Sequence, residues 1–83
     1  MFSNLHVGNL NFDTTTADLR SLFAQQGEVK KAEVVTDLDS GRSRGFGFVE
    51  MATPDDAKAA IGALDGHNVD GRDITVDIAK PRS

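Results

Sequence analysis

Residues 44–51 combine aromatic, basic and glycine residues at a spacing that suits contact with a planar ligand. They read Arg-Gly-Phe-Gly-Phe-Val-Glu-Met, and successive side chains of a β-strand point to opposite faces of the sheet. As a strand, the segment would carry Arg44, Phe46 and Phe48 on one face, with both glycines, the valine and the methionine on the other. Two exposed rings beside a cation form a platform for stacking unpaired bases, next to a group that pairs with phosphate. The segment therefore predicts contact with single-stranded nucleic acid.

The rest of the chain supplies the elements that must position this strand. Alternating apolar residues predict strands at residues 5–10, 29–36, 44–51 and 74–78. A Thr-x-x-Asp capping signal starts a first helix at about residues 15–26. The pair Thr53-Pro54 starts a second helix, which ends at Gly66. The predicted element order is therefore β-α-β-β-α-β.

This order is typical of the α+β, ferredoxin-like fold. Right-handed crossovers would place both helices on one face of a four-stranded antiparallel sheet and leave the opposite face open. Gly45 and Gly47 are expected to face the helices, because a missing side chain lets a helix approach a strand closely. We expect the 83 residues to form one domain, 1–83, with a core at about 4–80.

Composition narrows the classes of function. The chain has no cysteine, which excludes a disulfide and a thiolate metal site. It has no apolar run long enough for a membrane span and no signal-peptide pattern at its start, so we expect a soluble, cytoplasmic protein. The net charge of −4 disfavours nucleic-acid binding, which is mainly electrostatic. Several acids fall in or beside the predicted helices, however, so we expect modest, salt-sensitive affinity.

Two signatures resemble those of the RNA-recognition-motif family. Residues 44–51 match its octamer, Lys/Arg-Gly-Phe/Tyr-Gly/Ala-Phe-Val-x-Phe/Tyr, at seven of eight positions, and only Met51 departs. Residues 5–10, Leu-His-Val-Gly-Asn-Leu, resemble the family's hexamer on the first strand. The likeness covers residues 4–80, and in overall style the chain resembles the small single-domain bacterial members and the glycine-rich plant members.

The resemblance implies roles for individual side chains in binding single-stranded RNA. It implies that Phe48 and His6 each stack on a base. It also implies that Phe46 packs against the sugars between them and that Arg44 pairs with a phosphate. The position of His6 departs from the family, because most members have Phe or Tyr there, but a histidine ring can still stack on a base.

Other charged residues modify this expectation. Three further cations belong to the predicted RNA-binding surface: Arg42 in a loop, and Lys80 and Arg82 after the last strand. Alternation also places three acids on or beside the open face: Glu33, Glu50 and Asp77. Acids repel phosphate, yet a carboxylate can accept a hydrogen bond from the exocyclic amine of a base. They lower the expected affinity and leave room for base selectivity.

The same patch of rings also suits a peptide, so a protein-interaction module is the alternative function, and the acidic net charge favours it. Single-stranded DNA binding is a weaker variant of the first interpretation. No constellation of residues has the spacing of a catalytic, metal or cofactor site, so we predict that the chain is not an enzyme. We expect it to be monomeric and to need no cofactor.

For several residues near the turns and strand ends, we expect structural roles or solvent exposure rather than contact with RNA. Asn9 is expected to shape the turn after the first strand by local hydrogen bonds. Phe12 is expected to pack at the start of the first helix, and Arg72 to be a solvated residue beside an Asp-Gly turn. Lys30 and Lys31 are expected to be solvated charges at the start of the second strand.

Overall fold

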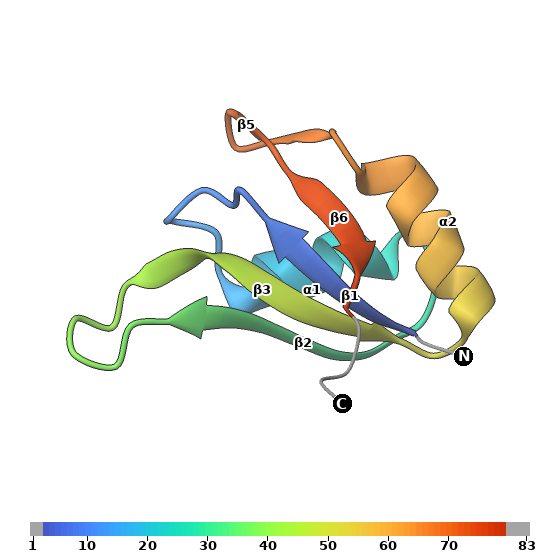
Figure 1. Cartoon of the computed structure of the whole chain (residues 1–83), viewed down its shortest axis with the longest axis horizontal. Helices are drawn as coiled ribbons and strands as arrows, with labels where there is room; N and C mark the ends of the chain where they lie inside the picture. Colours follow the sequence, from blue (N-terminus) through green and yellow to red (C-terminus); the bar gives the residue numbers. More distant parts are fainter. Residues whose placement is uncertain (1–2, 80–83) are drawn as a thin grey trace.

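The computed structural model describes residues 3–79, and its largest element is an antiparallel sheet of four strands. The strands are β1 (Asn4–Gly8), β2 (Val29–Thr36), β3 (Ser43–Met51) and β6 (Thr75–Ile78). They pair in the order β2-β3-β1-β6, which puts β1 and β3 at the centre (Figure 1). The two predicted signature segments therefore lie on neighbouring central strands.

Two helices connect the strands, and side chains just before each helix stabilise its start. Helix α1 (Thr16–Ala24) begins with a complete capping box between Thr15 and Asp18. Helix α2 (Pro54–Leu64) begins with Thr53, whose hydroxyl accepts a hydrogen bond from the Asp56 amide, followed by proline at the first helical position. Both starts agree with the sequence prediction. Within residues 3–79, no helix is long and apolar enough to cross a membrane.

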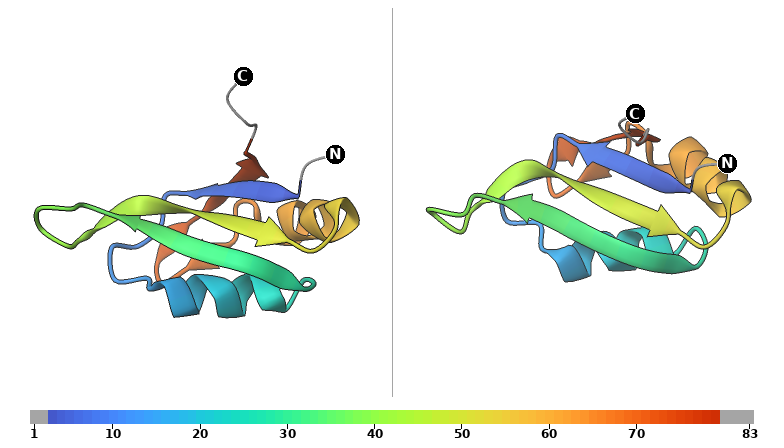
Figure 2. Two further views of the ribbon diagram at one scale, coloured as in Figure 1. Left: turned by 90° about the horizontal axis from the view of Figure 1, so that it is seen from below. Right: turned by 60° about the horizontal axis from the view of Figure 1, so that its bottom comes forward.

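Both helices cover the same face of the sheet. Leu19 and Phe23 of α1 and Ala60 of α2 join one buried cluster with the inward side chains of the strands, such as Leu5 and Val49. Figure 2 shows the sheet nearly edge-on, with α1 on one side of it. The other side carries no helix among the described residues. We call it the open face, and define it by the side chains of His6, Phe46 and Phe48. The expected ferredoxin-like arrangement is confirmed.

A short hairpin that the sequence pattern did not predict as strands precedes the last strand. Strands β4 (Asn68–Val69) and β5 (Arg72–Asp73) form a two-stranded sheet of their own. Asp70 and Gly71 form its turn, and both have positive φ angles, as the Asp-Gly signal indicates. Strands of two residues are too short to show an alternating pattern, which explains why only their turn was visible in the sequence.

Two irregularities in pairing bend the β2–β3 ribbon. Val29 pairs with Met51 but Lys31 pairs with Glu50, so β2 carries one extra residue, Lys30. At the other end, Val34 pairs with Gly47 but Thr36 pairs with Ser43, so β3 carries an extra pair of residues. Such bulges re-aim side chains locally. Side chains of β3 therefore alternate strictly between the two faces from Phe46 to Met51, but this alternation is interrupted before Phe46.

Gly47 is tightly packed against strand β2 and against Leu19 of helix α1. A Cβ at this position would lie 2.5 Å from the Glu33 carbonyl oxygen and 3.1 Å from a Leu19 methyl carbon. The prediction for Gly47 is confirmed. Gly45 differs: its φ is +82°, and a Cβ there would meet the Phe12 ring at 3.4 Å rather than a helix.

Replacing Gly47 by alanine should destabilise the protein by about 1–3 kcal/mol, because the added methyl group overpacks against a backbone oxygen that cannot yield. Gly62 is the matched control, since it lies in the exposed part of α2 and no atom lies within 4 Å of the place that its Cβ would take. Gly62→Ala should stabilise by roughly 1 kcal/mol through helix propensity. Urea denaturation measures both. A Gly47→Ala variant as stable as the parent would contradict the packing described here.

Candidate functional site

Three rings gather on the open face at the centre of the sheet. His6 comes from β1, and Phe46 and Phe48 come from β3. The His6 and Phe46 ring centroids lie 5.6 Å apart with the planes inclined by 25°, which is a stacked arrangement. Phe48 stands edge-on to both, at 5.4 Å from His6 and 6.0 Å from Phe46. We call these three side chains the ring cluster.

The three rings of the ring cluster differ in their exposure to solvent. Phe48 is 44% exposed. His6 and Phe46 are half-buried. Phe46 is less exposed than the sequence interpretation implied, because its ring packs against those of His6 and Phe48. The most accessible stacking surface is therefore Phe48.

The pairing register aligns four side chains in a row across the sheet. Glu33 of β2 pairs with Phe48, Phe48 pairs with His6, and His6 pairs with Asp77 of β6. Directly paired residues present their side chains on the same face. The row therefore has an acid at each end and two rings in the middle. This confirms that Glu33 and Asp77 lie on the open face, as alternation predicted.

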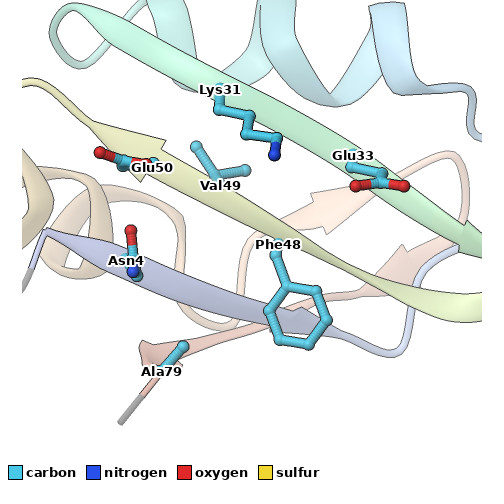
Figure 3. Close-up of a pocket in the computed structure, with 7 residues that line it drawn as sticks. All are labelled: Asn4, Lys31, Glu33, Phe48, Val49, Glu50 and Ala79. Atoms are coloured by element: carbon cyan, nitrogen blue, oxygen red, sulfur yellow. The ribbon is translucent and has the colours of Figure 1, made fainter. Parts of the chain in front are cut away.

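A hollow of about 290 Å³ adjoins Phe48 and extends toward the start of β1 and the end of β3 (Figure 3). Its lining comes from three neighbouring strands and the residue after β6, and we call it the edge hollow. The lining residues are Asn4, Lys31, Glu33, Phe48, Val49, Glu50 and Ala79. Sequence reasoning named Glu33 and Glu50 but missed Asn4 and Lys31 as members of the site. The signal available was the strand register, which opposes Lys31 to Glu50 and Asn4 to Glu50.

Lys30 and Lys31 are both exposed, as expected, and each also lies close to the site. The extra residue in β2 lets the Lys30 ammonium reach the Glu50 carboxylate at 3.9 Å. Lys31 lines the edge hollow. The Lys30–Glu50 pair is exposed, so it contributes little to stability, but it partly neutralises one acid of the open face.

The two arginines near the start of β3 lie at the irregular end of the ribbon. Arg44 is exposed, and the interrupted register means that alternation alone does not decide its face. The amides of Asp39 and Ser40 donate hydrogen bonds to the Asp37 carboxylate and lower the pKa of that group, and the Arg44 charge lowers it further. Arg42 lines a different hollow, of about 520 Å³, with Phe12 and Ser43. Lys80 and Arg82 lie outside the described residues.

The turn after β1 is organised by distant contacts, and the expectations for it are corrected. Asn9 adopts a φ of 56°; its amide donates to the Asp73 carbonyl at 2.7 Å, and its carbonyl accepts from Arg72 at 2.9 Å. The Arg72 guanidinium lies over the Phe12 ring, 5.8 Å from its centroid. Phe12 is 63% exposed, so it does not pack into the start of α1. The prediction of local bonding for Asn9 was wrong, because its partners come from β5.

The groups at this site can hold a ligand by stacking and by hydrogen bonding. The ring cluster offers flat apolar surfaces, and the edge hollow offers carboxylates, an ammonium and an amide beside one of those rings. Among the described residues, no three His, Cys, Asp or Glu side chains come together in a way that could hold a metal ion. An exposed ring with polar groups at its edge suits the stacking and edge recognition of a planar heterocycle.

Comparison with known families matches this geometry. Residues 5–75 match the family described as the RNA recognition motif. The RbpA protein of Synechocystis sp. is 49% identical over 79 residues, a match that spans 95% of this chain and 78% of that protein.

Solved structures are similar over nearly the whole chain. The crystal structure of RNA binding protein PG1 has a TM-score of 0.92 and 46% identity, with 98% of both chains covered. A structure described as a Sxl-lethal protein–RNA complex has a TM-score of 0.94 and 30% identity, and the match covers 100% of this chain and 50% of that one.

Proposed function

The chain belongs to the RNA recognition motif family, and from this premise we propose that it binds single-stranded RNA on the open face of its sheet. The observation that carries the proposal is the exposed Phe48 ring, held edge-on beside His6 and Phe46 at the centre of the sheet. An exposed aromatic surface of this kind stacks unpaired bases. A structural relative described as a complex with RNA supports the same conclusion.

The ring cluster assigns different contacts to its members. Phe48 and His6, which are paired across β3 and β1, would each stack on one base, so that two neighbouring bases lie along the central row. Phe46, half-buried between the other two rings, would contact the sugars. This footprint corresponds to a short stretch of about two to four nucleotides.

Positive charges would hold the phosphates around this surface. Arg44 lies in β3 at the irregular end of the ribbon and is exposed, and Arg42 could reach the RNA from the loop before β3. Lys80 and Arg82, which lie outside the described residues, would contact the RNA where it leaves the open face. Because Glu33 and Asp77 flank the rings and the net charge is −4, binding should be modest and sensitive to salt.

The proposal includes several expectations about the whole chain. We propose that residues 1–83 act as one RNA-binding domain, without catalysis and without a cofactor. A monomeric state and a cytoplasmic localisation stay predictions. Preference for RNA over single-stranded DNA also stays a prediction, and oligonucleotides that differ only in ribose and deoxyribose measure it.

Replacing Phe48 by alanine should weaken RNA binding about 5- to 150-fold, because each stacked base contributes ~1–3 kcal/mol. Leu38→Ala is the matched control: Leu38 is 99% exposed in the β2–β3 loop, so the change removes apolar surface away from the ring cluster. Fluorescence anisotropy with a labelled oligoribonucleotide measures both affinities, and circular dichroism checks that both variants fold. Equal affinities of Phe48→Ala and the parent would refute stacking on this ring.

Replacing Arg44 by glutamine should weaken binding and reduce the salt dependence. Each phosphate contact to a single strand contributes a slope of about −0.7 in log affinity against log salt, so the slope should shrink by about that amount. Arg20→Gln on α1 removes the same charge from the helical side of the protein and should leave the slope unchanged.

The same salt titration separates RNA binding from the alternative function. Docking of a peptide on the ring cluster is mainly apolar and would show little dependence on salt. An affinity for oligoribonucleotides that does not change with salt would contradict binding through phosphate contacts. A salt slope of Arg44→Gln equal to that of the parent would contradict the assignment of Arg44 as a phosphate contact.

A further inference from the structure

The edge hollow carries polar groups that the fold itself does not use. Within residues 3–79, the side chains of Asn4, Lys31 and Glu33 make no hydrogen bond or ion pair with another part of the protein. Glu50 is the exception, because it is paired with Lys30. The hollow therefore presents one carboxylate, one ammonium and one amide that have no partner among residues 3–79, and Figure 3 shows Lys31 and Glu33 on β2, Asn4 on β1 and Phe48 on β3 between these strands.

The hollow has the volume of a site for one planar ring, and the Phe48 ring offers a surface on which such a ring can stack. Its volume of about 290 Å³ is at the lower end of the range for small-ligand sites, ~300–1,000 Å³. Phe48 lines it and is 44% exposed, so a base stacked on Phe48 would have its edge within the hollow. Glu33 is the direct cross-strand partner of Phe48 and lines the same hollow, so its carboxylate is available to a base that extends from the Phe48 ring into the hollow.

The arrangement of charges distinguishes among the four bases. Guanine carries two adjacent N–H donors, N1–H and the N2 amine, next to the O6 acceptor. A carboxylate can accept both donors together, and an ammonium can donate to O6. Glu33 and Lys31 come from the same face of β2 and offer these two groups side by side.

The other bases fit the same groups less well. Uracil presents one N–H between two carbonyl oxygens, so a carboxylate that accepts its proton meets the electron pairs of an oxygen on either side. Cytosine and adenine offer one amine each, next to an unprotonated ring nitrogen, and can satisfy the carboxylate only once. The set of polar groups therefore complements guanine best and uracil least.

We propose that the edge hollow selects guanine at the base position stacked on Phe48, with Glu33 as the residue that sets the selectivity. This inference rests on the proposed function, because it needs a base on Phe48. It also explains why an acid lies on a surface that binds phosphates: the carboxylate costs general affinity and gains discrimination. Lys31 compensates part of that cost.

Heptauridylate and three variants that carry guanosine, adenosine or inosine at the central position test the inference. Anisotropy titrations at low salt give the affinity of the intact chain for each. The guanosine oligonucleotide should bind at least about fivefold more tightly than heptauridylate, since a two-bond contact to a base edge discriminates by this much or more. Inosine lacks the N2 amine and should bind with intermediate affinity.

Two substitutions separate selectivity from charge. Glu33→Gln keeps the shape of the side chain but puts an amide donor where guanine also donates, so the ratio of guanosine to uridine affinity should fall close to one. Asp77→Asn removes the same charge from the opposite end of the central row, outside the edge hollow. It should raise the affinity for all four oligonucleotides and keep the ratio. Both acids are exposed, so both variants should fold.

The outcomes distinguish this inference from the function on which it rests. Equal affinities for the guanosine and uridine oligonucleotides, or a ratio that Glu33→Gln leaves intact, would overturn the selectivity and leave RNA binding in place. A ratio that falls equally in Asp77→Asn would show a general charge effect and would overturn the role of Glu33. Failure to bind any of the four would overturn both proposals.

Discussion

The hydrogen-bonded register between β1 and β3 pairs Leu5 with Val49 and His6 with Phe48, and the remaining features follow from it. Because side chains alternate along each strand, a slip of one residue would turn the rings toward the helices and the core leucine and valine toward water. Burial of Leu5 and Val49 against α1 and α2 therefore fixes the position of the rings as well. The same apolar contacts that stabilise the core hold His6 and Phe48 side by side on the open face.

Gly47 makes this arrangement compatible with close packing. It stands between the two phenylalanines in sequence but on the opposite face, where β2 and Leu19 leave no room for a side chain. Alternation of glycine with phenylalanine thus separates two requirements along one strand. The missing side chain of Gly47 leaves room for Leu19 of α1, and Phe46 and Phe48 form the surface on which we propose that bases bind. Stability and the proposed RNA binding therefore depend on opposite faces of the same strand segment, Phe46 to Phe48.

Electrostatics shapes the open face as much as the rings do. An acidic protein with an acid at each end of its central row cannot depend on a strong general attraction for phosphate. Two lysines instead lie close to acids of the open face. Lys30 pairs with Glu50, and Lys31 lines the edge hollow together with Glu33. The resulting surface has mixed charge, which agrees with the proposal that it recognises base edges as well as the phosphate backbone.

The sequence predicted the fold well, because its signals are local and mutually consistent. Residues 29–36 form β2 as predicted, and the capping box at Thr15 starts α1. Alternation of side chains also placed His6 and Phe48 on the open face. The edge hollow could not be predicted in the same way, because its lining comes from several strands whose register the sequence pattern does not give. The contacts of Asn9, Phe12 and Arg72 join segments about 60 residues apart, and no local pattern reports such pairs.

Chemical-shift mapping by NMR tests most directly whether the open face binds RNA. A short oligoribonucleotide is added to the labelled protein at low salt, and the side-chain and backbone resonances of all residues are followed. We predict that the ring signals of His6 and Phe48 move most, while signals of the outer surfaces of α1 and α2, such as Arg20 and Lys58, stay in place. Ring signals that do not move at saturating RNA, or changes confined to the helices, would contradict binding on the open face.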